Sequence, residues 1–161
     1  MEKLYSKSET GCCPRFDPKP WNEKTVKWEN KLFLKDHVFC LFHIPVGMGK
    51  MMVKNMEIIA NSKSLAPKPM MLFDYTSLWG ADIYIAVKKP VKGAEMTKIS
   101  GTFLSKVFDG PYKDTGKWVK EMQGYVNKMG KNMKRLYYFY TMCPACAKHY
   151  GKKYTVLLAK I

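Results

Sequence analysis

The chain has 161 residues, of which 47% are hydrophobic and 14% aromatic, which is typical of one packed globular domain and excludes an intrinsically disordered protein. No stretch approaches the ~20 consecutive apolar residues of a membrane helix. The N-terminal sequence MEKLYSKSET lacks the apolar core of a secretory signal, so we expect a cytoplasmic protein without a membrane partner. The formal net charge of +15 comes mainly from lysines scattered along the chain. A specific nucleic-acid reader usually clusters arginines with aromatic residues, so specific nucleic-acid binding is not expected.

Residues 1–30 are predicted to form an irregular N-terminal arm, because CCPRFDPKPW carries three prolines in ten residues. Residues 31–161 are expected to form one domain. From Lys35 the run HVFCLFHI predicts a strand that ends near Pro45. A helix follows, predicted from side chains at the spacing of one helix face: Met48, Met52, Met56 and Ile59. Two further strands, MMLFDY and LWGADIYIAV, complete the first half.

The second half repeats this order of elements. TKISGTFLSKVF predicts a strand, DGPY a turn, and the stretch from Asp114 to Met129 a helix, followed by the strands KRLYYFYTM and KYTVLLAKI. The helix openings GKMMVKNM and GKWVKEM are also alike. We therefore predict two βαββ repeats, at about 33–90 and 96–161. They should give an α+β fold, with two helices on one face of an antiparallel sheet and a central ligand groove between the repeats.

The five cysteines are odd in number, so a disulfide framework is not expected in a cytoplasmic protein. The CPAC motif, Cys143 to Cys146, is predicted at a hairpin tip, as in a zinc knuckle. Cys12 and Cys13 would complete the site if the arm crosses the hairpin, and a structural zinc would fix the arm to the domain. Two alternatives stay open, a redox or disulfide pair and thiols with no special role. A redox pair usually needs a helix N-terminus, and a hairpin tip does not provide one.

The stretch ISGTFLSKVFDGPYKDTGKWVKEMQGYV combines a glycine-containing strand, a Gly-Pro-Tyr turn and a helix with an early tryptophan. It resembles the GyrI-like small-molecule-binding domain, and LWGADIYIAV resembles the strand leading out of that family's first repeat. The resemblance implies the duplicated βαββ layout. Its members include effector-binding domains of multidrug-responsive regulators, gyrase-inhibitory proteins and hydrolases of small reactive molecules. Many relatives carry a ligand-facing glutamate where this chain reads LYYFYT, and the cysteines mark a distinct stand-alone subgroup.

The predicted groove has candidate residues of two kinds. If the strands alternate faces, aromatic side chains would line it and suit a flat, mostly apolar ligand, although about half should be core. These are Trp79, Tyr84, Phe103, Phe108, Tyr112, Tyr138 and Tyr140. A hydrolase also needs a general base, for which the candidate acids are Glu95, Asp82 and Glu29, with His37 or His43 as alternatives. We therefore expect binding of a small, partly aromatic molecule, and its hydrolysis if the chain is an enzyme. The alternative is a noncatalytic sequestering or interaction protein with a structural zinc.

Overall fold

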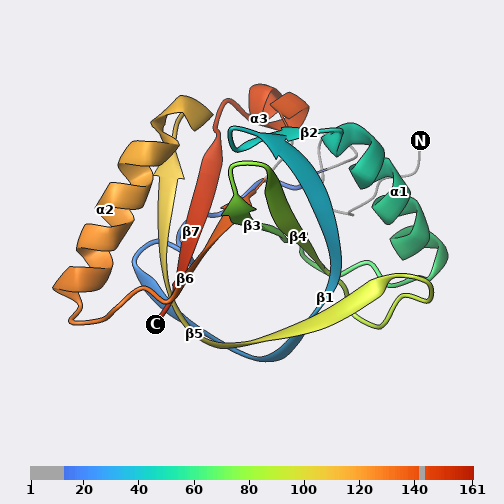
Figure 1. The fold of residues 1–161 in the computed structure, drawn as a ribbon, viewed down its shortest axis with the longest axis horizontal. Helices are drawn as coiled ribbons and strands as arrows, with labels where there is room; N and C mark the ends of the chain where they lie inside the picture. Colours follow the sequence, from blue (N-terminus) through green and yellow to red (C-terminus); the bar gives the residue numbers. More distant parts are fainter. Residues whose placement is uncertain (1–12, 142–143) are drawn as a thin grey trace. The chain divides into compact units, whose positions relative to one another are not determined.

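The computed structural model describes residues 13–141 and 144–161 and shows a mixed α+β fold (Figure 1). The contacts divide the chain into two compact units. We call residues 28–100 the central unit, and the described parts of 1–27 and 101–161 the terminal unit. Within the described residues, no helix is long and apolar enough to cross a membrane.

The central unit is built on an antiparallel sheet and one helix. Strand β1 (Lys24–Leu41), most of which lies in this unit, pairs antiparallel with both β2 (Ile44–Val46) and β4 (Gly80–Ala86), and β4 pairs with β3 (Met71–Ser77). Helix α1 (Met48–Asn61) buries Met51, Asn55 and Ile59. The buried face therefore shares only Ile59 with the predicted methionine face. It also includes Asn55, a polar residue that a search for hydrophobic spacing does not identify.

The terminal unit packs one long helix against its sheet. Strand β7 (Tyr154–Lys160) pairs antiparallel with β5 (Glu95–Asp109) on one side and with β6 (Arg135–Tyr140) on the other. A short 3₁₀ turn (Tyr112–Asp114) leads into α2 (Thr115–Lys128). The core under this helix consists of Leu104, Phe108, Trp118, Met122, Val126, Leu157 and Ala159. The Phe108 and Trp118 rings are stacked there, with centroids 5.6 Å apart.

Each unit contains a strand, a helix and two strands in that order, namely β1, α1, β3, β4 and β5, α2, β6, β7. The prediction of a plain sheet with two helices on one face is nevertheless wrong. Strand β1 has 18 residues and β5 has 15, both run from one unit into the other, and the two strands pair. Twist accumulates along strands of this length, so they cannot lie in one flat sheet. The described residues also include a third α-helix, α3 (Pro144–Tyr150).

Two boundaries differ from the sequence prediction. Strand β1 begins at Lys24, inside the predicted arm, because Val26 and Trp28 alternate with exposed polar residues as a strand requires. The predicted hairpin tip at the CPAC motif is wrong, because α3 begins at Pro144. Proline is well suited to the first position of a helix, and two alanines follow in PACAKHY.

The described part of the arm packs onto α3. Cys13 and Phe16 contact the buried cluster of Cys146, Ala147 and Tyr150. The Tyr150 hydroxyl donates a hydrogen bond to the Cys13 carbonyl oxygen at 2.6 Å. The Arg15 guanidinium lies over the Tyr150 ring, 4.7 Å from its centroid. Within the terminal unit, the described part of the arm is thus held against α3.

Candidate functional site

The two faces of β1 have different surroundings in the central unit. Asp36, Val38 and Cys40 share one face, and this face meets α1, because Asn55 of that helix donates a hydrogen bond to the Asp36 carboxylate at 2.8 Å. Lys35, His37 and Phe39 lie on the opposite face. Val38 and Cys40 are buried, whereas His37 and Phe39 are exposed. The face of β1 opposite α1 therefore carries a histidine and a lysine two residues apart.

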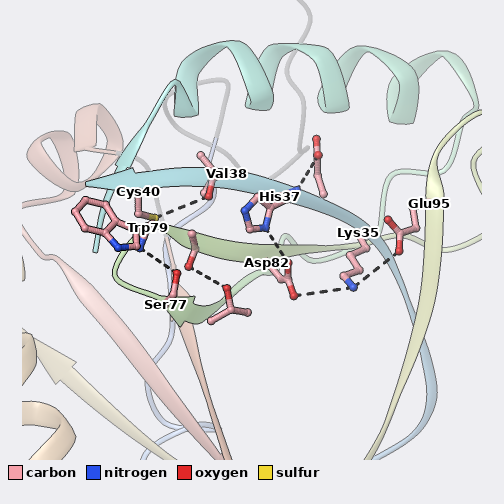
Figure 2. Close-up of polar contacts among 11 residues, drawn as sticks. Lys35, His37, Val38, Cys40, Ser77, Trp79, Asp82 and Glu95 are labelled. Atoms are coloured by element: carbon pink, nitrogen blue, oxygen red, sulfur yellow. Dashed lines mark hydrogen bonds and ion pairs between the residues drawn. The ribbon is translucent and has the colours of Figure 1, made fainter. Parts of the chain in front are cut away.

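The β1–β4 register places an acid directly opposite this histidine. His37 pairs with Asp82, and Figure 2 shows the two side chains pointing toward one another across the sheet. The imidazole Nδ1 lies 3.0 Å from Asp82 Oδ1. The Lys35 Nζ lies 4.0 Å from Asp82 Oδ2 and 3.8 Å from Glu95 Oε1. We call these four residues, Lys35, His37, Asp82 and Glu95, the ionic cluster.

Exposure differs between the members of the His37–Asp82 pair. The His37 side chain is 58% exposed and that of Asp82 is 20% exposed. The carboxylate is therefore partly shielded from water and can hold the ring, while the ring itself remains accessible to a solute. In the tautomer with the proton on Nδ1, this nitrogen donates to Asp82, and Nε2 is left as the basic atom.

A glycine makes room for the imidazole. Gly80 lies at the start of β4, and a Cβ added there would be 2.7 Å from His37 Nε2 and 2.8 Å from Cε1. These distances are shorter than any ordinary contact of a Cβ atom. The ring thus lies closely against the β4 backbone, and only a residue without a side chain leaves this space free. The Gly80 carbonyl oxygen accepts a hydrogen bond from Thr76 Oγ1 at 3.2 Å, which fixes the strand beneath the ring.

A second carboxylate faces Asp82 from the next strand. Asp74 of β3 pairs with Asp82 of β4 in the antiparallel register. Directly opposite residues of such a pair have Cβ atoms about 4.5–5.5 Å apart, and like charges at that separation are unfavourable. The Lys35 ammonium, bound between Asp82 and Glu95, offsets part of this repulsion. Two carboxylates, those of Asp74 and Asp82, thus lie opposite one another on this face of the sheet.

The covered face of β1 contains an acid with a different role. Burial by itself raises the pKa of the Asp36 carboxyl, but hydrogen bonds from Asn55 and the His37 N–H, together with Lys54, outweigh it and hold the pKa below its usual value. The Lys54 Nζ is 3.3 Å from Asp36 Oδ2. Asp36 therefore joins β1 to α1 as an ionised carboxylate. On the same face, burial raises the pKa of the Cys40 thiol, which disfavours the thiolate needed for nucleophilic chemistry.

Replacing Asp36 by asparagine is expected to lower the free energy of unfolding by about 1 kcal/mol near neutral pH. Since the folded-state pKa is depressed, this stabilisation is fully present above the unfolded pKa of about 3.9 and is lost as the pH falls through the folded pKa. Urea unfolding at several pH values measures the difference between wild type and variant. A difference that stayed constant down to pH 2 would contradict the proposed role of the charge.

The candidate acids and bases of the sequence analysis separate into two groups. Asp82 and Glu95 come together through Lys35, and His37 joins them. Glu29 is exposed and lies six residues before Lys35 on β1, a distance of about 20 Å along an extended strand. His43 lies in the turn after β1 and stacks edge-on against Tyr75, with ring centroids 5.5 Å apart. Among the described residues, no carboxylate partners His43.

The seven aromatic candidates lie in different surroundings. In the central unit, Tyr84 is buried against Phe33, while Trp79 is 49% exposed in the β3–β4 turn. In the terminal unit, Phe103 and Phe108 belong to the core. The remaining three, all in the terminal unit, form an aromatic cluster in which Tyr140 contacts the rings of Tyr112 and Tyr138, at centroid distances of 5.3 and 6.3 Å.

Two of the four predicted metal ligands, Cys12 and Cys143, lie outside the described residues. The other two, Cys13 and Cys146, belong to the same cluster at α3. In the part of the chain that the structure describes, no group of three or more histidine, cysteine or acidic side chains is arranged to hold a metal ion.

Among the hollows on the described part of the surface, two shallow ones are lined by residues other than the ionic cluster. One, of about 400 Å³, lies along α1, where it is lined by Gly49, Lys50, Val53, Lys54 and Glu57. The other, of about 280 Å³, lies in the terminal unit, where it is lined by Pro18, Lys19, Asn22, Val107, Asp109 and Tyr154. Neither combines a base with an acid partner, so the chemistry of the ionic cluster, rather than concavity, identifies the candidate site.

Two residues of this face were missed by the sequence analysis. Lys35 and Asp74 were not among the candidates, because no local motif distinguishes them from the other lysines and acids. The signal lies in the strand register, which pairs Asp74 with Asp82 and brings Lys35 alongside. An alignment of the alternating polar positions on β1, β3 and β4 could have grouped them, but only after the pairing of the strands was known.

Solved structures with a similar fold come from Listeria innocua. A hydrolase shares 11% sequence identity with this chain, with a TM-score of 0.61 and coverage of 87% of this chain and 91% of that one. A second hydrolase structure has 11% identity, a TM-score of 0.59 and coverage of 87% and 92%. An uncharacterized conserved protein has 12% identity, a TM-score of 0.57 and coverage of 86% and 92%. At these identities the likeness establishes the fold alone.

No curated protein matches the sequence. A family model does, and it extends over almost the whole chain. The model is described as bacterial hydrolase and matches residues 3–161. This chain therefore belongs to the bacterial hydrolase family.

Proposed function

We propose that this chain hydrolyses a small, partly aromatic molecule at the ionic cluster of the central unit. The observation that carries the proposal is the His37–Asp82 pair, in which a partly shielded carboxylate holds an exposed imidazole at 3.0 Å. A positioned imidazole is a common general base, and an acid partner orients the ring and stabilises its charged form. Membership of a hydrolase family supports a reaction of this class.

The proposed step uses water as the nucleophile. His37 Nε2 accepts a proton from a water molecule as its oxygen attacks the electrophilic carbon of the substrate, and Asp82 stabilises the imidazolium that forms. The imidazolium then returns the proton to the leaving group, so the net reaction adds one water across the broken bond. The Lys35 ammonium lies where it can stabilise negative charge developing on the substrate oxygen, although it is also bound by two carboxylates.

The local charge indicates which substrates this face favours. Two carboxylates, Asp82 and Glu95, hold the Lys35 ammonium. We therefore propose an uncharged or cationic substrate in preference to an anion, even though the net charge of the whole chain would attract anions. The resemblance to GyrI-like domains, which bind small organic molecules, agrees with this substrate class.

The proposal is tested by incubating the purified protein with a panel of small reactive substrates that differ in charge and aromatic content. Neutral and cationic aryl esters, anionic aryl esters and activated cyclopropanes would be followed for product formation. We expect turnover of uncharged or cationic aryl substrates by the wild type, and its loss in His37→Gln. Turnover that survives in His37→Gln and Asp82→Asn would place the chemistry elsewhere, and the proposal would fail.

Where the N-terminal arm and the CPAC motif would meet, we propose a structural zinc site of Cys12, Cys13, Cys143 and Cys146. The packing of Cys13 against the cluster that contains Cys146 supports this proposal, because the predicted crossing of the arm requires the two to be close. Such a site would hold the arm by four thiolates. It also fits the alternative function, a noncatalytic sequestering or interaction protein, in which the zinc is purely structural.

Elemental analysis of untagged protein tests the zinc site. We expect about one zinc ion per chain, lost in Cys13→Ser and in Cys146→Ser. Cys40→Ser is the matched control, because Cys40 is buried in the central unit beside the Val38 carbonyl oxygen and should leave the zinc content unchanged. Metal-free protein in which all five thiols react with a thiol reagent would exclude the site.

A further inference from the structure

One end of the central unit exposes an unusual number of large apolar side chains. Strand β1 ends there in a two-residue turn to β2, and the β3–β4 turn lies beside it. The exposed fractions range from 46% to 67%, for Phe39, Leu41, Phe42, Ile44, Val46, Leu78 and Trp79. We call these seven residues the apolar edge patch.

The apolar edge patch is continuous. Phe39 pairs with Val46 and Leu41 with Ile44 across the β1–β2 ladder, so these four side chains share one face. The two turns are joined by a hydrogen bond from the His43 N–H to the Leu78 carbonyl oxygen, 3.0 Å long. The Phe42 and Trp79 rings have centroids 5.2 Å apart. The seven residues therefore form a single surface.

The area of this surface exceeds what a monomer usually exposes. Seven large side chains at about half exposure present on the order of 600–700 Å² of apolar surface, whereas the largest patch on a typical monomer is about 300–600 Å². A standard protein–protein interface buries about 800 Å² per partner, including its polar rim. The apolar edge patch is therefore large enough to form the centre of an interface, and it is too broad and flat to be filled by one small molecule.

The turn at the tip of the patch is built against its local preference. Phe42 and His43 both have positive φ, 50° and 65°, at the two positions of a tight hairpin turn where Asn-Gly is the usual choice. A bulky residue in this conformation is rare and costs on the order of 1–3 kcal/mol. The fold thus accepts strain that places an aromatic ring, 65% exposed, at the tip. Backbone strain of this kind is commonly retained at functional sites, so we infer that the exposed Phe42 ring takes part in a contact.

The charge distribution indicates what covers the patch. Strand β2 is the edge strand of the sheet, and edge strands of soluble proteins are commonly protected by lysine. The chain has 28 lysine and arginine residues, yet none lies between Lys35 and Lys50, the segment that contains β2 and its turn. The lysines that would prevent two edges from pairing are therefore missing at this one strand. Because the patch itself is uncharged, two copies can meet there without like charges in contact.

We propose that the apolar edge patch is the interface of a twofold symmetric homodimer in which the β2 edges of two copies lie together. An isologous contact of this kind uses the same patch on both chains. Pro45 lacks an N–H, so the contact is made mainly by the side chains of Phe42, Ile44 and Val46, with few ladder hydrogen bonds. The inference does not depend on the proposed hydrolase activity.

The net charge predicts the salt dependence of this association. Each copy carries a net charge of +15, so repulsion between the two copies opposes dimer formation at low ionic strength. Added salt screens the repulsion and should tighten the dimer. Binding of an acidic protein or a nucleic acid to the lysines would instead weaken as salt is added, because salt weakens attraction between unlike charges.

Sedimentation equilibrium of the full chain at increasing concentration tests the proposal. We expect a monomer–dimer equilibrium at concentrations up to about 100 µM, with a smaller Kd at high salt than at low salt. Ile44→Lys should raise the Kd at least about tenfold, because each substitution occurs twice and places two lysines at the centre of the contact. Met129→Lys is the matched control, since Met129 is 50% exposed in the terminal unit and should leave the Kd unchanged.

A second variant separates dimerisation from folding. Asparagine tolerates the left-handed conformation of position 42, so Phe42→Asn should preserve or raise the urea midpoint of the dilute monomer while weakening the dimer at least about fivefold. Three results would overturn the proposal. They are a chain that stays monomeric throughout, a dimer whose Kd is unchanged by both Ile44→Lys and Phe42→Asn, and a dimer that dissociates as salt is added. Activity measured in the same variants shows independently whether the His37 site is intact.

Discussion

Replacing His37 by glutamine is expected to reduce kcat/KM by about 10²- to 10⁴-fold on any substrate that the wild type hydrolyses. Glutamine retains a hydrogen-bonding group near Asp82 but has no basic atom, so water activation is lost while the sheet keeps its pairing. The loss should appear in kcat rather than in KM, because the imidazole acts on the attacking water and contributes little to ground-state binding.

Asp82→Asn and the double variant show whether the two residues act as a unit. Asparagine can still contact the ring but cannot stabilise the imidazolium, so a large loss is expected, and the double variant should be little worse than His37→Gln alone. His43→Asn is the matched control, since asparagine tolerates the positive φ of that turn and His43 lies away from the ionic cluster. Equal losses in His37→Gln and His43→Asn would indicate a general disturbance of the β1 edge and would argue against the assigned base.

The regular elements were predictable because local periodicity determines them. The helix predicted from Asp114 to Met129 is α2, and the strands KRLYYFYTM and KYTVLLAKI contain β6 and β7. In α2, the buried residues Trp118, Met122 and Val126 recur every four residues, as on one face of a helix. The spacing of apolar residues within one segment identifies a helix face or a strand, so these elements can be recognised without knowing what they contact.

The candidate site depends on information that no single segment contains. His37 and Asp82 were both named as possible participants, but they are 45 residues apart in sequence, and only the β1–β4 register pairs them. A shift of that register by one residue would turn Asp82 to the α1 face and remove the pair. Lys35 and Asp74 were missed for the same reason. Composition identified the chemical groups, and strand pairing decided which of them meet.

The two wrong local predictions, at the CPAC motif and at the start of β1, each have a cause in the nearby sequence. The CPAC motif was interpreted from its spacing alone, and a metal knuckle and a short helix both accommodate two cysteines three residues apart. Pro144 favours the first turn of a helix, and this preference outweighed the turn expected from the flanking strands. The start of β1 was missed because lysines interrupt its apolar residues, even though Val26 and Trp28 alternate correctly.

Replacing Gly80 by alanine is expected to lower kcat/KM by about tenfold or more while leaving the fold intact. The new Cβ would lie 2.7 Å from His37 Nε2, so the imidazole must move. The ring belongs to an exposed side chain, which can rotate at little energetic cost, and Gly80 does not have a positive φ that alanine would strain. The thermal midpoint should therefore change by only a few degrees. The displaced ring, however, can no longer keep its 3.0 Å contact with Asp82.

A double variant identifies the mechanism of the loss. If Gly80→Ala acts by separating His37 from Asp82, then adding Asp82→Asn to it should cost little further activity. Gly49→Ala is the matched control, because a Cβ at that position of α1 meets no atom within 4 Å. A fully active Gly80→Ala variant, or a large further loss when Asp82→Asn is added to it, would show that the close packing of the ring on β4 has no part in orienting the base.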